Sequence, residues 1–266
     1  MTPQKLEILS DESIDIFFIA LHGKFGEDGT LQQLMEERGL VYTGCGPEAA
    51  QLAFDKIKSK RIFRQIGIDT PDALEITSSH RLNEAKKLLP EMEGKFVVKP
   101  SREGSSIGII LAEGPADALK AAEEIFTVYG DCLIEEYIDG RELTVGILGE
   151  KPLPVIEISH GKRSYYDYNA KYIDEETAFL FETIKDKSLA ENIRSTAMKC
   201  FKALQCRDLA RVDIIMDNQG RICPLEVNSI PGFTSHSLLP MAAAQDGLSM
   251  EQLCIKIVES ALARNN

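Results

Sequence analysis

Apolar residues recur along the chain in two patterns, the short runs typical of strands and the spaced repeats typical of helices. The run from Ile14 to Leu21 ends at His22 and predicts a buried parallel strand that leads into a loop. Other short apolar runs predict strands at residues 40–42, 95–99, 107–111, 132–136, 142–148 and 153–159. Residues 211–216 and 223–228 flank an Asn-Gln-Gly turn, so these two segments predict a β-hairpin.

Helical periodicity accounts for much of the remaining chain. A helix is predicted to begin at Thr30, and further helices are predicted at residues 50–66, 115–126 and 186–204. The last helix begins with a capping box formed by Ser249 and Gln252. Because strands and helices mix throughout the chain, the expected fold class is α/β or α+β.

Composition narrows the class of protein. Of the 266 residues, 44% are hydrophobic and 27% are charged, which is ordinary for a globular protein and excludes collagen-like, coiled-coil and wholly disordered chains. The formal net charge of −12 disfavours nonspecific binding to nucleic acid or to anionic membranes. A local basic pocket can still bind an anionic small molecule.

The cysteines and the first residues of the chain indicate the cellular compartment in which the protein is expected. The six cysteines are scattered, with no Cys-x-x-Cys pair and no zinc-type spacing, so reduced and mostly buried thiols are expected. The first residues do not have the pattern of a signal peptide, and the apolar run of residues 16–21 is too short to span a bilayer. The expected location is the cytoplasm.

The predicted hairpin carries a set of hard oxygen donors. Side chains two residues apart on a strand point to the same face. Arg211 and Asp213 therefore share one face of their strand, and Glu226 and Asn228 share one face of theirs. If the two strands pair, three oxygen donors converge in a way that suits Mg²⁺. A solvated face with a surface salt bridge would have the same pattern.

A glycine- and serine-rich loop follows the predicted strand that ends at Lys99. Its sequence, Lys-Pro-Ser-Arg-Glu-Gly-Ser-Ser-Ile-Gly, combines a positive charge with backbone N–H groups that suit phosphate. Neither the Walker A order nor the dinucleotide-binding Gly-x-Gly-x-x-Gly order occurs in this loop. An ordinary turn remains an alternative from the residues alone.

Three further stretches carry polar chemistry. The acidic strand at 134–138 and Glu142 could contact an adenine and a ribose, or form a plain acidic strand and turn. Residues 164–172 hold four tyrosines, typical of a loop that folds over a ligand or of an aromatic surface loop. The glycine-rich segment after His22 lies between a strand and a helix, where ligands bind in open α/β sheets, although a lone histidine there is more often structural.

Taken together and in this order, these stretches resemble the D-alanine–D-alanine ligases of the ATP-grasp superfamily, from about Asp15 to the C-terminus. The shared signatures are His-Gly-x-x-Gly-Glu-Asp-Gly, Lys-Pro-Ser-Arg-Glu-Gly-Ser-Ser-x-Gly, Tyr-Asp-Tyr-x-Ala-Lys-Tyr and Glu-x-Asn-x-x-Pro-Gly-x-Thr-x-x-Ser-Leu. The resemblance implies an ATP-grasp fold with a truncated Rossmann-like N-terminal domain. It also implies three regions, a substrate domain at 1–44, a central subdomain at 45–134 and a catalytic subdomain at 135–266.

The resemblance implies roles for individual residues. Those implied to bind ATP are Lys56, Lys99, Ser105, Ser106, Glu135, Glu136, Tyr137, Ile138, Glu142 and Lys171. Those implied to hold two Mg²⁺ or Mn²⁺ ions are Asp213, Glu226 and Asn228. Those implied to serve catalysis are Arg211 and Gly232 as oxyanion stabilisers, with Lys171, Tyr172, Ser105 and His22. Those implied to bind the D-alanine substrates are His22, Arg211, Gly232, Ser237 and Leu238.

The implied reaction joins two D-alanines through an acylphosphate, giving D-alanyl-D-alanine for peptidoglycan precursors. Tyr172, in place of a histidine, is the family's pattern for D-alanine over D-lactate as second substrate. The resemblance also implies a homodimer.

One family feature is missing from this sequence. Family members begin with a strand, a Gly-Gly-x-Ser-x-Glu-type loop and a helix, and no residue here matches the glutamate of that loop. We therefore expect an uncovered edge of the N-terminal sheet, and either a truncated reading frame, a partner over that face or reduced activity. Two alternatives follow, a different ATP-grasp ligase and a nucleotide-binding protein without ligase activity.

Overall fold

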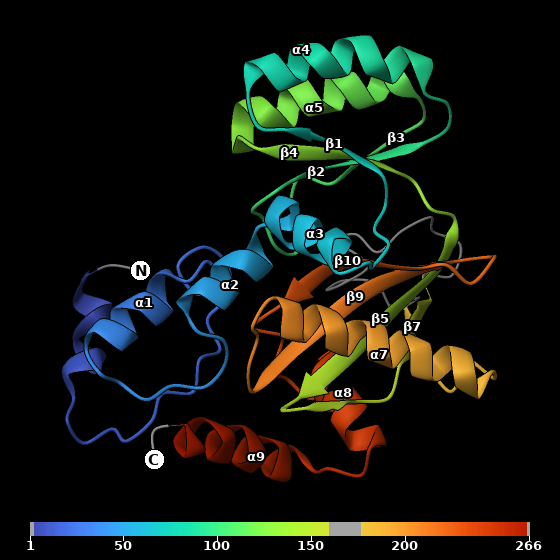
Figure 1. Ribbon diagram of the computed structural model, residues 1–266. Coiled ribbons are helices and arrows are strands. Elements are labelled where there is room, and N and C mark those ends of the chain that lie inside the picture. The colour runs from blue at the N-terminus through green and yellow to red at the C-terminus, as the bar shows by residue number, and fades with distance from the viewer. Residues whose placement is uncertain (1–2, 160–176, 265–266) are drawn as a thin grey trace.

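The computed structural model describes residues 3–159 and 177–264 of the chain. Helices pack on two separate antiparallel sheets, and an N-terminal lobe lies to one side of them (Figure 1). No helix in the described ranges combines the length and the apolar character needed to cross a membrane.

The N-terminal lobe corrects the first strand prediction. It contains a 3₁₀ helix, Pro3–Ser10, and the helices α1 (Thr30–Glu37) and α2 (Pro47–Phe54). Residues 14–21 are partly or fully exposed and form only one parallel bridge, between Phe17 and Tyr42. The prediction of a buried parallel strand here, and of a short strand at 40–42, was therefore wrong, because neither segment pairs along its length.

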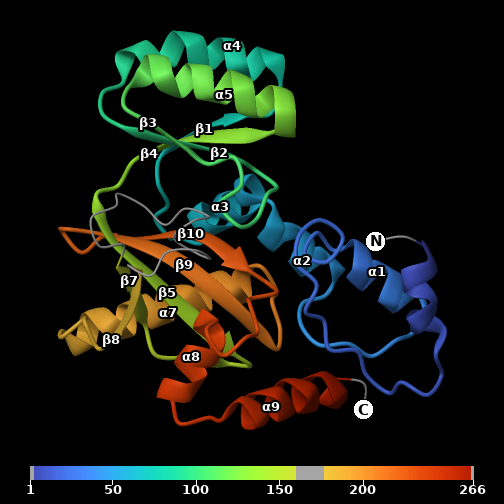
Figure 2. The same ribbon diagram turned by 180° about the vertical axis from the view of Figure 1, so that it is seen from behind.

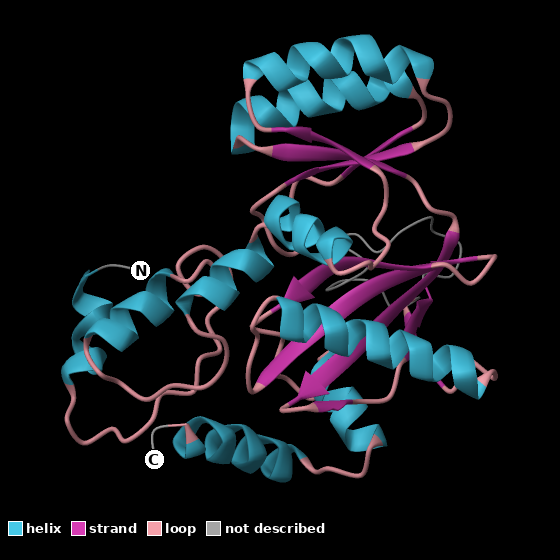
Figure 3. Cartoon of the chain, in the orientation of Figure 1, coloured by secondary structure: helices cyan, strands magenta, loops and turns pink. Residues whose placement is uncertain are grey.

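The first sheet is the smaller one. Its strands are β1 (Ala73–Ile76), β2 (Phe96–Pro100), β3 (Ile110–Ala112) and β4 (Cys132–Glu136), in the order β1-β4-β2-β3. Helices α4 (Ser79–Leu88) and α5 (Pro115–Tyr129) lie side by side over its outer face (Figure 3). Their apolar side chains form a core with Phe96, Val98 and Ile134, which leaves the opposite face for the second sheet.

The second sheet carries the predicted hairpin. Its strands are β5 (Gly140–Leu148), β6 (Lys151–Pro152), β7 (Ile156–Ser159), β8 (Ala178–Phe181), β9 (Leu209–Asp217) and β10 (Ile222–Asn228). The order is β10-β9-β5-β7-β8, with β6 on the end of β5, and β9 and β10 pair as predicted. The segment at Asp139 joins β4 of one sheet to β5 of the other, so it links the two sheets.

Helices cover this sheet on both faces. Helix α7 (Lys187–Ala203), with α2 and α3 (Lys56–Gln65), packs on one face, and α8 (Leu238–Gln245) packs on the other. Gly146 of β5 lies under α8, where a Cβ would stand 2.7 Å from Leu239 Cδ1. Helix α9 (Met250–Ala263) has the predicted capping box and runs back to the N-terminal lobe, where Arg264 donates to the Tyr42 carbonyl over 2.9 Å (Figure 2).

The helix predicted at 50–66 is two helices, because the chain breaks at Asp55. This residue adopts an extended conformation (φ −91°, ψ 99°), and its side chain accepts from the Lys58 N–H over 3.2 Å. Aspartate favours such N-cap positions, since its carboxylate satisfies an N–H that the new helix leaves unpaired. The break directs the first turns of α3 toward the space between the sheets.

Phe63 fixes α3 in place, so Phe63→Ala is expected to destabilise the protein by about 3–5 kcal/mol. The ring is fully buried in the core shared by α3 and the second sheet. Urea unfolding, monitored by circular dichroism, measures the decrease in the free energy of unfolding. Val128→Ala, at a side chain that is 70% exposed, is the matched control, and an equal effect of the two changes would contradict the assignment.

Candidate functional site

Two neighbouring cavities lie in the molecule, the first between the two sheets and the second beside the N-terminal lobe. The first has a volume of about 330 Å³ and is lined by residues of both sheets, and the second has a volume of about 590 Å³. Lys56 and Glu226 line both cavities. We refer to them as the inter-sheet cavity and the lobe cavity.

Most of the residues singled out from the sequence lie in these cavities. Those lining the inter-sheet cavity are Lys56, Lys99, Ser106, Glu135, Glu136, Tyr137, Ile138, Glu142, Asp213 and Glu226. Those lining the lobe cavity are His22, Lys56, Ser105, Arg211, Glu226, Asn228, Gly232, Ser237 and Leu238. Lys171 and Tyr172 lie outside the described residues.

A buried ion-pair triad lies at the inter-sheet cavity, which two of its three members, Lys99 and Glu135, line. The two oxygens of Glu135 lie 2.9 Å from Lys60 Nζ and 2.8 Å from Lys99 Nζ. Burial alone would raise the pKa of Glu135, but the charges of the two lysines outweigh it and hold the pKa below its usual value. Glu135 therefore pairs with two lysines where it lines the cavity, and its contact to adenine stays a prediction.

The last residue of β4, Glu136, and Tyr137 directly after it have their own contacts. Glu136 Oε1 accepts from the Arg221 guanidinium over 3.1 Å and from the Asp72 N–H over 3.2 Å. The Tyr137 N–H donates to the Lys95 carbonyl over 3.0 Å. These bonds hold in place the segment that leads from the first sheet to the second. The same segment carries Ile138 and is followed by Glu142, and both of these residues line the inter-sheet cavity.

The β9–β10 hairpin places the oxygen donors as the strand pattern predicted. Asp213 pairs across the ladder with Glu226, and Arg211 pairs with Asn228. The Arg211 guanidinium donates to both oxygens of Asp213 over 2.8 and 2.7 Å, and Thr144 donates to the same carboxylate over 2.7 Å. Arg211 is thereby held rigidly at the border of the lobe cavity.

The donor set fits a divalent cation. Asp213 and Glu226 present carboxylates from directly opposed strand positions, and Asn228 adds an amide oxygen two residues further along β10. The cations next to them are Arg211 and Lys56, whose Nζ lies 2.9 Å from Glu226 Oε2. Within the described ranges no three His, Cys, Asp or Glu residues gather at one point, so such a site has two carboxylates and an amide.

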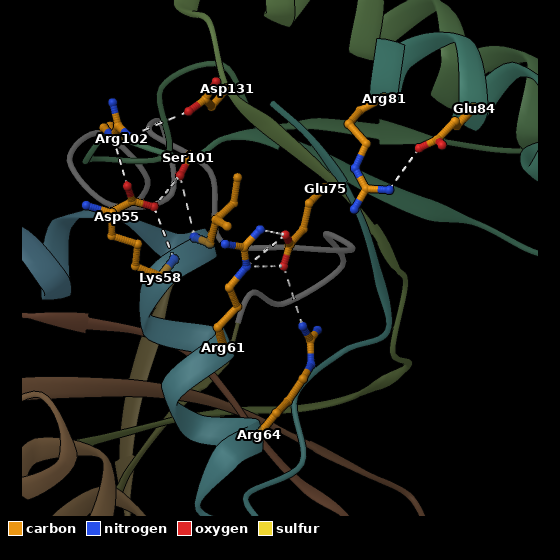
Figure 4. Close-up of polar contacts among 11 residues, drawn as sticks. Asp55, Lys58, Arg61, Arg64, Glu75, Arg81, Glu84, Ser101, Arg102 and Asp131 are labelled. Carbon is orange, nitrogen blue, oxygen red and sulfur yellow. Dashed lines mark hydrogen bonds and ion pairs between the residues drawn. The ribbon is translucent and has the colours of Figure 1, made fainter. Parts of the chain in front are cut away.

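Asp55 anchors the glycine- and serine-rich loop to the start of α3 (Figure 4). Its carboxylate accepts from the Ser101 hydroxyl and from the Arg102 guanidinium, each over 2.8 Å. Burial opposes ionisation, yet these donors hold the pKa of Asp55 below its usual value. The loop that follows has Ser105 and Ser106 in the left-handed region, and Lys56 Nζ donates to its Glu103 carbonyl over 2.7 Å.

Asp55→Asn is expected to loosen this loop and to lower the free energy of unfolding by about 1–3 kcal/mol at pH 7. Because the folded-state pKa of Asp55 is depressed, its contribution is present above the unfolded pKa and is lost as the pH falls through the folded one. The difference between variant and parent should therefore shrink below about pH 4. Urea unfolding at pH 7 and pH 3.5 measures it, and a pH-independent difference would contradict the assignment.

The lobe cavity is closed by two turns. His22 Nδ1 lies 4.0 Å from Glu27 Oε1, and the proximity of this carboxylate raises the His22 pKa despite partial burial. On the other side, Ser237 precedes α8, and its hydroxyl accepts from the Thr234 N–H over 3.0 Å. A Cβ on Gly232 would lie 2.8 Å from Ser237 Oγ, so glycine is required for this close approach.

Three residues of the site were missed in the sequence. Lys60 lies in a helical segment where a charged residue normally indicates a solvent face, and Asp55 stands inside an otherwise helical pattern. Glu27 belongs to the glycine-rich signature, yet only the fold shows it beside His22 and 3.6 Å from a Cβ built on Gly104. Asp55 carried a local signal, the N-cap preference of its residue type, whereas Lys60 carried none.

Two antiparallel sheets that enclose a lysine-lined cavity, next to a second cavity bordered by an arginine, define an ATP-grasp protein. The sequence model of the family described as "D-ala D-ala ligase C-terminus" matches residues 62–259, and that of the "D-ala D-ala ligase N-terminus" matches residues 3–45. The chain belongs to the D-alanine–D-alanine ligase family.

Individual relatives agree with this family. The D-alanine–D-alanine ligase B of Chromobacterium violaceum is 39% identical over 96% of this chain and 83% of its own length. The crystal structure of the Bacillus anthracis D-alanine–D-alanine ligase complexed with ATP has a TM-score of 0.84 at 35% identity, covering 99% of this chain and 84% of that one. The D-Ala:D-Ser ligase VanG of Enterococcus faecalis has a TM-score of 0.82 at 31% identity, covering 93% and 73%.

Proposed function

We propose that the protein joins two D-alanine molecules to D-alanyl-D-alanine and cleaves ATP to ADP and phosphate. The observation that carries this proposal is the junction of the two cavities at Lys56 and Glu226. A nucleotide in the inter-sheet cavity would direct its terminal phosphate toward an amino acid in the lobe cavity. Family membership supports the same substrates.

The inter-sheet cavity suits ATP in charge and in shape. Its wall at Val97, Ile109 and Leu111 is apolar and can bind the adenine ring, while Glu142 is placed to accept from ribose hydroxyls. Lys99 and Lys56 supply positive charge for the phosphates, and Ser106 belongs to the loop above them. Such charge stabilises the terminal phosphoryl group as it is transferred.

The reaction then proceeds in two steps. A carboxylate oxygen of the first D-alanine attacks the γ-phosphorus and releases ADP, so the poorly reactive carboxylate becomes an acylphosphate. The amine of the second D-alanine attacks the acyl carbon, loses a proton and expels inorganic phosphate. Arg211 and the Gly232 N–H stabilise the oxyanion that forms between these events, with the effect expected of donors fixed in place before the reaction.

Asp213, Glu226 and Asn228 would hold Mg²⁺ or Mn²⁺ ions at the junction. When bound, such ions neutralise charge on the transferring phosphoryl group. The chain's own part is to keep the donors on opposed strands and to hold Arg211 against Asp213, so that the arginine stays at the border of the lobe cavity.

The two amino acid sites would lie at opposite ends of the lobe cavity. His22, supported by Glu27, lies on the side of the N-terminal lobe and is suited to the first D-alanine. Ser237 and Leu238 lie at the start of α8, where backbone N–H groups and the helix dipole favour the carboxylate of the second D-alanine. Lys171 and Tyr172, which lie outside the described residues, keep the roles that the family resemblance implies, binding of the γ-phosphate and choice of the second substrate.

Product analysis tests this function. The full chain is incubated with ATP, Mg²⁺ and D-alanine, released phosphate is measured, and the dipeptide is identified by mass spectrometry. D-alanine-dependent phosphate together with D-alanyl-D-alanine is the expected result. ATP binding without dipeptide would favour the nucleotide-binding alternative, and D-alanyl-D-serine in a mixed assay would favour the specificity named for the Enterococcus faecalis relative.

The family resemblance also supports a homodimer that works in the cytoplasm on peptidoglycan precursors. Light scattering coupled to size-exclusion chromatography measures the oligomeric state. A mass equal to one chain of 29.5 kDa would contradict the dimer and leave the proposed reaction intact.

A further inference from the structure

Lys60 is one of the largest fully buried side chains of the described structure, and it lines neither cavity. Burying an ammonium group is costly unless the group is paired. Its partner is Glu135, whose second oxygen pairs with Lys99 at 2.8 Å. Lys99 does line the inter-sheet cavity, so Lys60 stands behind a residue that faces the proposed nucleotide.

The charges of this triad explain what Lys60 contributes. Two ammonium groups and one carboxylate leave a net charge of +1 next to the cavity. Without Lys60, the remaining pair of Glu135 and Lys99 would be neutral, and its attraction for an anion would be that of a dipole. A site for a polyphosphate needs the uncompensated charge, because Coulomb attraction in a partly buried cavity is strong.

We propose that Lys60 is a positioning residue that binds Glu135 and thereby leaves the charge of Lys99 available to the phosphates of ATP. The proposal rests on the ATP site inferred above. It assigns Lys60 no contact with the nucleotide, since Glu135 lies between them. The effect is transmitted through one shared carboxylate.

The surroundings of Lys60 predict a pH dependence. The groups that face it are Glu135 and Lys99 of the first sheet, Arg64 of its own helix, Cys200 of α7 and Cys223 of β10. Burial lowers the pKa of Lys60 to about 8, while burial raises the pKa values of the two thiols to about 12 and about 11, so both stay neutral near pH 8. ATP affinity is therefore expected to fall as the pH rises from 7 to 9.

Calorimetric titration of the full chain with ATP and Mg²⁺, without D-alanine, tests the proposal. Lys60→Met is expected to weaken ATP binding about tenfold or more. It should also abolish the decrease in ATP affinity between pH 7 and pH 9. Lys60→Arg keeps the charge and should bind ATP nearly as well as the parent. Adenosine, which lacks phosphates, should bind parent and Lys60→Met alike.

A double variant separates charge from structure. Lys60→Met with Glu135→Gln removes one positive and one negative charge, so the net charge returns to +1 and ATP affinity should recover. A purely structural role predicts that the double variant binds no better than Lys60→Met. Thermal melting confirms that each variant is folded.

The outcomes distinguish this inference from the proposed function. Equal ATP affinity of the parent and Lys60→Met, or a double variant as weak as Lys60→Met, would overturn the role of Lys60 and leave the ligase proposal standing. A parent protein that binds no ATP would overturn the proposed function itself.

Discussion

Arg211→Met should lower kcat for dipeptide formation by about a hundredfold to a thousandfold, with ATP binding retained. The guanidinium is held by two hydrogen bonds to Asp213 and lines the lobe cavity but not the inter-sheet cavity that we assign to ATP. A rigid cation at this position acts on the oxyanion, which exists only after the carboxylate has been activated. The loss should therefore appear in kcat and not in nucleotide affinity.

Rapid-quench measurement of ADP and dipeptide separates the two steps for this variant. Arg211→Lys keeps the positive charge but lacks the planar guanidinium group with its fixed N–H donors, so an intermediate rate is expected. Arg194→Met is the matched control, because the half-buried Arg194 pairs with Glu191 of its own helix and lines neither the inter-sheet cavity nor the lobe cavity. A change in ATP affinity as large as the change in kcat would argue against an oxyanion role.

Glu226→Gln should reduce kcat by about a hundredfold or more and raise the Mg²⁺ concentration needed for half-maximal activity. The change keeps the shape of the side chain and removes the charge that faces Asp213 across the ladder and Lys56 at 2.9 Å. Both cavities are affected, since Glu226 lines each of them. Removal of divalent cations by a chelator should abolish turnover in the parent as well.

Titration of activity with Mg²⁺ and with Mn²⁺ provides the measurement. Glu113→Gln is the control, because Glu113 pairs with Lys95 at the surface of the first sheet and lies in neither cavity. An unchanged cation requirement in Glu226→Gln would remove this residue from the proposed donor set.

The β9–β10 hairpin shows which features of the site local sequence patterns can predict. Strand alternation placed Arg211 with Asp213 and Glu226 with Asn228, and the turn between the strands implied the pairing that the structure contains. Both inferences depend on residues near one another in the chain. The segment at 14–21 shows the opposite case, because an apolar run becomes a strand only where neighbours pair with it, and here a single bridge forms.

The sequence by itself determined the family signatures, the donor types and the pairing of the two hairpin strands, because these depend on residue identity and short-range periodicity. Only the tertiary structure decided that Lys60, Lys99 and Glu135 meet in one buried triad and that two cavities share Lys56 and Glu226. The physical reason is that a lysine is buried only when a partner from a distant segment neutralises it. Helical periodicity assigns such a residue to solvent, and the packing of α3 between two sheets overrides that assignment.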